Sequence, residues 1–424
     1  MNRRKRALAL LVSLALAVAA FSGCSDGPGE NRVFPSNRGE ERECELTFFG
    51  FKYEALNVTA IEDALHGYMD QHPETNISYD GIKSPEYFEV LSKRLATGNG
   101  DDIFMVDHER ALELGAQGKL ADLSDLSTLD RFSGLAKSQM YAGDTLYYIP
   151  TSISAFGLYC NLDLLKEHGQ MVPENLAEFE AVCDYFVGQG ITPIVANNDI
   201  SLKTVAIAKA MLPVYQSEDP VAAIGRFNSG EANLAEALRP GFSFVEEMLS
   251  RGWVDREEAR DTAKTKDDLV LFAGGERPFM LTGAWATPRL RECSPDFSFE
   301  VRPYPIAEDG SVLVVNVDTR VSVNADSPHL EEAKRFVEYL TQPDALWEFV
   351  DSQSSFSPLD ENRLAEDKAI QSIGPYLTNG RCVLGADDNL QLPIWDVTRQ
   401  CIAGMLEGDS AESAVSRMEE LISQ

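Results

Sequence analysis

Between residues 45 and 106, apolar residues follow two alternating periods, one typical of strands and one typical of helices. Residues 45–50 are a short apolar run rich in β-forming residues, and residues 76–79 and 102–106 are also expected strands. Between these runs, apolar residues recur at spacings of three and four, which predicts amphipathic helices. The inward positions of the two helices are Val58, Ile61, Leu65, Tyr68 and Met69 in the first, and Phe88, Leu91 and Leu95 in the second. This order of elements predicts parallel βαβ units.

The rest of the chain continues the same mixture of elements. A mostly helical stretch is expected from about residue 201 to 268, and Ala333, Phe336, Val337 and Leu340 share one face of a helix over residues 330–340. The further expected strands are residues 154–161, 191–195, 279–282, 312–317 and 321–323, and the further helices are residues 162–168, 173–187 and 414–422. The sequence therefore predicts an α/β protein, and its 424 residues exceed the size of a single core, so we expect at least two domains.

The N-terminus has the pattern of an export signal. Basic residues 3–6 precede an uncharged apolar run over residues 7–21, which is too short to span a membrane comfortably. The next residues, Phe21-Ser-Gly-Cys24, resemble the bacterial lipobox, in which the cysteine is lipidated, although leucine is more usual than Phe21. We expect residues 1–23 to be a signal peptide and Cys24 to carry the lipid. A plain secreted protein is the alternative.

Charge agrees with export behind a tether. Residues 24–43 are polar and rich in Gly, Pro and charge, as a flexible tether would be. The formal net charge of −31 becomes −35 when residues 1–23, with four positive and no negative charges, are removed. Such an acidic chain has no electrostatic footprint for nucleic acid and would be repelled by anionic lipid, so the lipid on Cys24 would hold it at the membrane.

Six cysteines remain after Cys24, and their spacing leaves their pairing open. Cys382 and Cys401 are the first candidate for a disulfide, and Cys160 and Cys183 are the second. The alternative is that a residue such as Cys183 is simply a buried thiol. No CxxC motif is present and the five histidines are scattered, so neither a metal site nor a cofactor is expected. The GxSxG, HExxH, P-loop and GxGxxG motifs of common enzymes are also missing.

The order of several segments resembles the extracellular solute-binding lipoproteins of bacterial ABC importers, in the group that binds carbohydrates, such as maltose or multiple sugars. Residues 93–106, KRLATGNGDDIFMV, are similar to the family's ASGDAPDVFMV, and YYIP at 147–150 with GLYCNLDLL at 157–165 is similar to YAIP and GLYYNKDLF. Residues 190–194, 280–285 and 333–340 also fit. The resemblance extends from about residue 44 to 421. Cys160 and Asn175-Leu176 depart from the pattern, at positions in the scaffold.

This resemblance implies a periplasmic-binding-protein-like fold with two α/β lobes, a hinge that the chain crosses several times, and a ligand cleft between the lobes. Lobe 1 would comprise residues 44–152 and 314–356, and lobe 2 residues 157–313 and 357–424. The candidate hinge segments are residues 150–156, 306–314 and 356–360. The protein would be a monomer that delivers a carbohydrate to the transmembrane subunits of an ABC permease.

Nine residues are candidate ligand contacts, by resemblance and by their position after strands, where open α/β sheets bind ligands. A sugar needs an aromatic ring to stack on and polar groups to bond its hydroxyls. The candidates are Trp285, Asp107, His108, Asp387, Asp388, Tyr53, Glu54, Ser152 and Phe356. Each has a scaffold role as the alternative. Trp285 could be a core residue, Asp107 and His108 a solvated loop pair, Asp387 and Asp388 turn-forming residues, and Tyr53 and Glu54 the entry to a helix.

Other functions remain as alternatives. The ligand could be a polyamine, a peptide or a phosphate ester, although the acidic loops disfavour an anion unless Lys52 or Arg289 faces the cleft. A surface glycoside hydrolase would need two placed carboxylates. An adhesin or sensor could use the same fold without transport. We expect a binding protein and not an enzyme.

Overall fold

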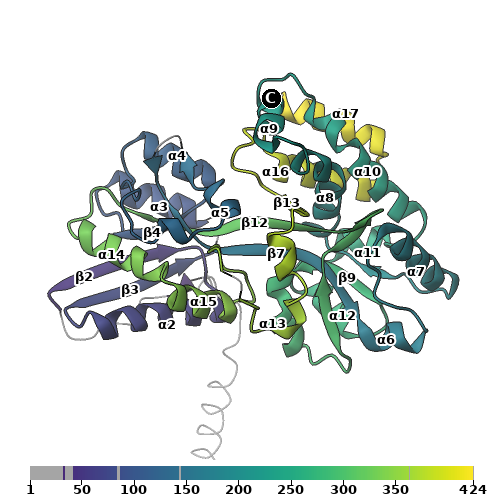
Figure 1. Ribbon diagram of the computed structural model, residues 1–424, viewed down its shortest axis with the longest axis horizontal. Coiled ribbons are helices and arrows are strands. Elements are labelled where there is room, and N and C mark those ends of the chain that lie inside the picture. Colours follow the sequence, from purple (N-terminus) through teal and green to yellow (C-terminus); the bar gives the residue numbers. More distant parts are fainter. Residues whose placement is uncertain (1–31, 34–41, 84–85, 143–144, 362, 424) are drawn as a thin grey trace, which may run out of the picture.

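The computed structural model describes residues 32–33, 42–83, 86–142, 145–361 and 363–423 (Figure 1). The predicted signal peptide, Cys24 and most of the predicted tether lie outside these residues. No helix in the described part of the chain is both long and apolar enough to cross a membrane.

The strands and helices have the following bounds. The strands are β1 (Arg32–Val33), β2 (Cys44–Gly50), β3 (Thr75–Ile82), β4 (Ile103–Val106), β5 (Tyr141–Ala142), β6 (Thr145–Leu146), β7 (Ile149–Asn161), β8 (Ile194–Val195), β9 (Phe279–Gly283), β10 (Phe299–Arg302), β11 (Tyr304–Ala307), β12 (Gly310–Val323) and β13 (Cys382–Leu384). The α-helices are α2 (Ala55–Gln71), α3 (Glu86–Ala96), α4 (His108–Ala116), α5 (Gly134–Lys137), α6 (Leu162–Glu167), α7 (Leu176–Gly188), α8 (Ser201–Tyr215), α9 (Pro220–Asn228), α10 (Leu234–Ser250), α11 (Arg256–Asp261), α12 (Asp267–Ala273), α13 (Thr287–Glu292), α14 (Leu330–Leu340), α15 (Pro343–Ser352), α16 (Ile394–Glu407) and α17 (Ala411–Ile422). Short 3₁₀ helices are η1 (Leu129–Arg131), η2 (Ala284–Ala286), η3 (Lys368–Ile370) and η4 (Gly374–Leu377).

The chain forms two α/β lobes that share one sheet. The strand order is β1-β3-β2-β4-β12-β7-β9-β8, and β10, β11 and β13 pair with β7 or β12 outside this path. In lobe 1, β2 is parallel to both β3 and β4, as the alternating pattern predicts. Helices α2, α3, α4, α14 and α15 surround these strands (Figure 1). In lobe 2, α10 packs against α8 and α17, and α16 against α17.

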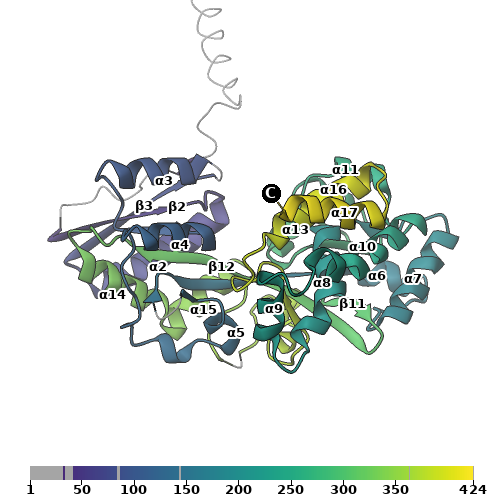
Figure 2. The same cartoon turned by 90° about the horizontal axis from the view of Figure 1, so that it is seen from above.

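The long strands β7 and β12 pass from one lobe into the other, as Figure 2 shows for β12. At one end, Ile149 of β7 and Val321 of β12 pack in the core of lobe 1. At the other end, alternate residues of both strands pack in two cores on opposite faces of the lobe 2 sheet. The strands pair antiparallel through the crossing, where Asp318 lies opposite Ser152 and Arg320 opposite Pro150.

The predicted helical faces agree with the buried residues, with one exception. All five inward positions of α2 are buried, and so are the four of α14. In α3, however, Tyr87 is buried with Leu91 and Leu95, whereas Phe88 is only partly buried. Tyr87, Leu91 and Leu95 are each four residues apart and share one face, and the Tyr87 hydroxyl donates to the Met105 carbonyl at 2.6 Å.

The predicted disulfide between Cys382 and Cys401 is wrong, because both residues are free thiols in the structure. Cys401 belongs to the core on one face of the lobe 2 sheet, whereas Cys382 packs against the core on the other face. The second candidate pair, Cys160 and Cys183, is also free, and each residue is a fully buried thiol among apolar side chains. Burial raises the pKa of both thiols, so neither is poised to react.

Candidate functional site

A cavity of about 570 Å³ lies between the two lobes, within the size range of small-molecule sites. Four of the nine candidate residues line it: Tyr53, Glu54, Ser152 and Trp285. The complete lining comprises residues 51–54, 56–57, 83, 152, 154, 264–266, 285, 288–289, 318, 352–353 and 355. Both lobes and both crossing strands therefore contribute to one site.

The loop between β2 and α2 brings Lys52, Tyr53 and Glu54 to the cavity from lobe 1. It leaves the carboxyl end of a central parallel strand, where ligands of open α/β sheets bind. The strand ends at Gly50, where a Cβ atom would lie 2.4 Å from the Tyr79 hydroxyl, so a larger residue would displace the packing beneath the loop. Glu54 precedes the first residue of α2, and its carboxylate accepts from the Asn57 amide at 3.1 Å.

Glu54 also connects the two lobes across the cavity. Its Oε1 lies 3.6 Å from Nη2 of Arg289, which comes from α13 in lobe 2. Both side chains are about one third exposed, so solvent weakens this ion pair. A ligand entering the cavity could therefore exchange contacts with either group at low cost.

Trp285 lies in η2, directly after β9, and its ring is partly exposed to the cavity. Phe156 of β7 meets it edge to face, with ring centroids 5.1 Å apart and an interplanar angle of 83°. A Cβ atom on Gly283 would lie 2.3 Å from the indole ring, so only glycine leaves the ring in this position. The indole is thus held from one side and offers apolar surface to the site.

The floor of the cavity is made by the crossing strands. The Ser154 hydroxyl donates to Asp318 Oδ2 at 2.9 Å, and the Ser152 hydroxyl bonds Thr319 Oγ1 at 3.1 Å. Lys52 Nζ lies 4.0 Å from Asp318. Desolvation raises the pKa of Asp318, but Lys52 and the hydrogen bonds from the Thr319 N–H and Ser154 outweigh it, so the pKa lies below its ordinary value.

Strained backbone gathers around this cavity. Four described residues other than glycine have positive φ, and three of them, Thr265, Thr319 and Ser354, line the cavity or adjoin residues that do. The φ angles of these three are 55°, 47° and 47°. Residues other than glycine seldom adopt this backbone conformation. It costs about 1–3 kcal/mol and tends to occur at functional sites. The strain therefore supports the cavity as the functional site.

Asp107 and His108 do not line the cavity. The Asp107 carboxylate accepts from the Arg110 N–H at 2.7 Å and caps helix α4, a role that fully accounts for its residue type. His108 Nδ1 lies 3.3 Å from Asp388 Oδ2. Ligand contact by these two residues stays a prediction, although Asp107 is engaged as a helix cap and His108 lies beside Asp388.

Asp387 and Asp388 also lie outside the cavity lining, in a polar network that joins the 385–389 loop to lobe 1. Asp388 pairs with Arg320 Nη2 at 2.6 and 2.8 Å and accepts from the Tyr148 hydroxyl at 2.8 Å. Its N–H donates to Gln139 Oε1 at 2.6 Å. Burial raises the pKa of the Tyr148 hydroxyl. The negative charge of Asp388 raises it further, and the positive charge of Arg320 lowers it by less than burial raises it.

Asp387 completes this network. It accepts from Gln139 Nε2 at 3.0 Å and from the Tyr215 hydroxyl at 2.7 Å, so it joins lobe 1 to helix α8 of lobe 2. Asn389 donates to the Ser138 carbonyl at 2.9 Å. The two aspartates therefore bind the protein itself, and ligand contact by either of them stays a prediction.

Phe356 has its side chain in a core of lobe 2, where it is 4% exposed. Its backbone exchanges two hydrogen bonds with Ile153 of β7, at 2.7 and 3.0 Å. The neighbouring Gln353 and Ser355 line the cavity instead. Other cavity residues that the sequence reasoning did not choose are Asn57, Lys83, Ser154, Lys264, Lys266 and Asp318.

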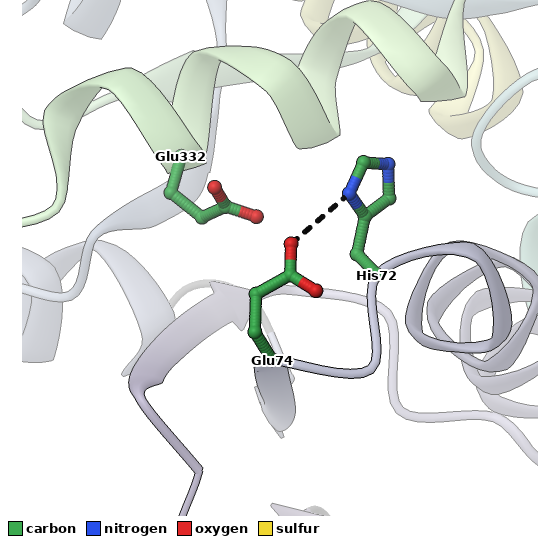
Figure 3. A group of neighbouring side chains, drawn as sticks. All are labelled: His72, Glu74 and Glu332. Atoms are coloured by element: carbon green, nitrogen blue, oxygen red, sulfur yellow. Dashed lines mark ion pairs between the residues drawn. The ribbon is translucent and has the colours of Figure 1, made fainter.

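One group of side chains, His72, Glu74 and Glu332, has ligand atoms close enough together to hold a metal ion (Figure 3). His72 Nδ1 lies 3.5 Å from Glu74. Glu332 is already engaged, because Tyr68 and Thr75 each donate to its Oε1 at 2.7 Å and Arg335 pairs with Oε2. A cation would have to compete with Arg335, so Glu332 serves better as a link that fastens α14 to α2 and β3.

Comparison with known proteins agrees with this architecture. The family model described as "Bacterial extracellular solute-binding protein" matches residues 64–372. The multiple sugar-binding protein of Streptococcus mutans is 20% identical over 348 residues, covering 78% of this chain and 79% of that protein. The maltodextrin-binding protein MdxE of Bacillus subtilis is 23% identical over 239 residues, covering 53% and 52%.

Solved structures show the same fold. The apo form of RafE from Streptococcus pneumoniae superposes with a TM-score of 0.73 at 20% identity, covering 90% of this chain and 98% of that one. A sugar transporter protein of Bacillus licheniformis, solved with stachyose, gives a TM-score of 0.68 at 20% identity, covering 89% and 99%. The chain therefore belongs to the family of bacterial extracellular solute-binding proteins.

Proposed function

We propose that this protein is the lipid-anchored substrate-binding subunit of an ABC importer, and that it captures an oligosaccharide in the cavity between its lobes. The observation that carries the proposal is the cavity itself, whose lining includes Trp285, Ser152, Ser154 and Asp318. An apolar ring with hydroxyl and carboxylate partners matches the two faces of a sugar. The names of the relatives, which bind multiple sugars or maltodextrin, support the same ligand class.

The lobes would close on the ligand by bending where the strands cross. Val314, Val315 and Val317 pack in the cores of lobe 2, and Val321 in that of lobe 1, so we move the proposed second crossing from residue 314 to residues 318–320. Thr319, with φ of 47°, lies at this point. The proposed crossings at 150–156 and 356–360 are kept, whereas we assign residues 306–314 to lobe 2, because Ile306, Val312 and Val314 pack in one of its cores.

The rest of the assembly is proposed from the N-terminal sequence and the family. Export, cleavage before Cys24 and lipidation of that residue would leave the folded protein on the outer face of the membrane as a monomer. It would then present the ligand to the transmembrane subunits of a permease. No role in nucleic-acid binding is proposed.

A glycoside hydrolase is the less favoured alternative. The two carboxylates that line the cavity, Glu54 and Asp318, each lie beside a cation, Arg289 and Lys52 respectively. A general acid of a glycosidase needs a raised pKa, and the pKa of Asp318 is lowered. Product formation during incubation with bound oligosaccharide would support the hydrolase instead.

The test is isothermal titration of the mature protein with a broad panel of neutral and acidic oligosaccharides, repeated with Trp285→Ala and Trp285→Phe. Loss of the indole should weaken binding at least tenfold, or about 1.4 kcal/mol, and phenylalanine should restore part of it. A folded protein that binds no saccharide would refute the carbohydrate proposal. Unchanged affinity of Trp285→Ala would remove this residue from the site.

A further inference from the structure

The cavity carries a charge opposite to that of the protein. The chain has 68 acidic and 37 basic residues, so acids outnumber bases almost twofold. Among the residues that line the cavity, five are basic and two are acidic. The basic residues are Lys52, Lys83, Lys264, Lys266 and Arg289, and the acidic ones are Glu54 and Asp318. A surface selected only for solubility in this protein would show the reverse ratio.

The positive charges come from both lobes and therefore face a common space. Lys52 and Lys83 belong to lobe 1, and Lys264, Lys266 and Arg289 belong to lobe 2. Cations of like sign on two approaching surfaces oppose closure unless an anion lies between them. Glu54 supplies one such anion opposite Arg289, and a negatively charged ligand would offset the remaining repulsion and link binding to closure of the lobes.

The chain neutralises only part of this charge. Lys52 and Arg289 lie 4.0 and 3.6 Å from Asp318 and Glu54, at the long end of ion-pair distances. Lys264 pairs with Asp199. Within the described part of the chain, the exposed ammonium groups of Lys83 and Lys266 form no ion pair with a carboxylate, and Lys83 lies 5.6 Å from the ring centroid of Tyr53.

We propose that the ligand is an acidic oligosaccharide, whose sugar rings carry carboxylate or sulfate groups. This inference rests on the proposed function and names the substrate class of the same cavity. Trp285 would stack on a sugar ring, while the ammonium groups and the Arg289 guanidinium bind the anionic substituents by charge-assisted hydrogen bonds. The condition under which the sequence allowed an anionic ligand, Lys52 or Arg289 facing the cleft, is met by both residues.

The first test compares sugars that differ only in charge. Digalacturonate and its neutral counterpart, α-1,4-linked galactobiose, share linkage and ring configuration and differ at C6. Longer members of both series, and a sulfated galactan oligosaccharide, extend the comparison. Titration at pH 7 in low salt should show the acidic series binding at least tenfold more tightly, or about 1.4 kcal/mol, with the difference shrinking as salt is added. The uronate and sulfate arms distinguish the two anionic groups.

The second test removes the unpaired charges. Lys83→Gln/Lys266→Gln should weaken binding of the preferred acidic sugar roughly fivefold and change that of a neutral sugar less than twofold. The matched control, Lys93→Gln/Lys166→Gln, removes the same charge from exposed sites outside the cavity and should have no effect. An equal loss in both double variants would show a long-range charge effect and overturn the proposal.

The outcomes separate the two proposals. If neutral oligosaccharides bind as tightly as acidic ones or more tightly, the acidic ligand is refuted and the carbohydrate-binding function stands. If no saccharide of either series binds the folded protein, the proposed function itself fails. The proposal of a saccharide ligand would likewise be overturned if a phosphate ester without a sugar, or inorganic sulfate alone, bound as tightly as the acidic oligosaccharides.

Discussion

Replacing Asp388 by asparagine tests whether the 385–389 loop has a structural role at the junction of the lobes. The substitution keeps the size of the side chain and removes its charge. Arg320, which is 12% exposed, would lose the carboxylate that pairs with it at 2.6 and 2.8 Å. The Tyr148 hydroxyl would lose a charged acceptor. Asp388 itself is 7% exposed, so water cannot replace these partners freely.

The expected loss of stability follows from this burial. Removing one partner of a buried ion pair leaves an uncompensated charge and costs about 3–5 kcal/mol. Asp318 also attracts Arg320 and raises its pKa, so part of the charge stays compensated. We therefore expect a loss of about 3 kcal/mol, at the lower end of that range.

A matched pair elsewhere in the chain provides the control. Asp309 and Arg381 form a bidentate pair at 2.8 and 2.9 Å, but the Asp309 side chain is 75% exposed. Exposed pairs of this kind often contribute nothing measurable, so Asp309→Asn should leave stability unchanged. The two variants share the same chemistry and differ in burial.

The assay is urea unfolding followed by tryptophan fluorescence. With an m value of about 3 kcal/mol/M, Asp388→Asn should lower the midpoint by about 1 M. A double-mutant cycle with Arg320→Gln would isolate the coupling between the two side chains. If Asp388→Asn shifts the midpoint no more than Asp309→Asn, the network does not stabilise the junction. A selective loss of sugar affinity would then return Asp388 to the ligand site.

Three further predictions follow from individual residues. Gly283→Ala should push the Trp285 ring out of position and weaken sugar binding roughly tenfold in titrations. The backbone at Gly283 has φ of −76° and tolerates alanine, so the added methyl group clashes with the indole. Gly188→Ala, where the methyl group would enter open space, is the control, and equal affinities of the two variants would contradict the argument. Unfolded, unreduced protein lacking Cys24 should show six thiols with Ellman's reagent, of which only exposed Cys293 reacts quickly in the folded state, and a count of four would restore a disulfide. Burial lowers the pKa of Lys203 to about 8 despite Asp199, so below about pH 8 its charged form destabilises the folded state. As pH rises from 8 to 10.5, the free energy of unfolding of the wild type should increase by about 3 kcal/mol relative to that of Lys203→Met. The measurement is urea unfolding at each pH, and parallel pH profiles of the two proteins would exclude this effect.

The predicted elements that agree with the structure depend on local patterns. The inward faces of α2 and α14 follow from periodicity, because one face of each helix is buried. The parallel strands of lobe 1 follow from short segments between these helical patterns, and β3 and β4 are buried on both faces. Phe88 was expected on the inward face, and it packs against the core of lobe 1 but is only partly buried, whereas the neighbouring Tyr87 is fully buried. Only the partner of the helix, in this case the Met105 carbonyl, decides which of the two turns inward.

The cavity shows the same division between local and distant causes. Tyr53, Glu54 and Trp285 follow strands, so the rule that ligands bind beyond strand ends locates them. Asp318 lies in the middle of a strand and Lys264 in a loop before a helix, and no sequence pattern marks either position. An aspartate in a glycine-led loop looks the same whether it binds a ligand or an arginine. The partners of Asp388 lie 68 and 240 residues away, and only the fold brings them together.

Net charge illustrates why composition alone misleads about a binding site. The formal charge of −31 describes the whole surface, and the acidic loops that contribute to it disfavour an anionic ligand. The field inside a cleft, however, is set by the few charges within about a Debye length, or ~8–10 Å, because more distant exposed charges are screened. In this cleft those charges are mainly Lys52, Lys83, Lys264, Lys266 and Arg289, drawn from both lobes. An acidic protein can therefore hold a locally basic site, and its outer charge would also keep anionic ligands from binding elsewhere on the surface.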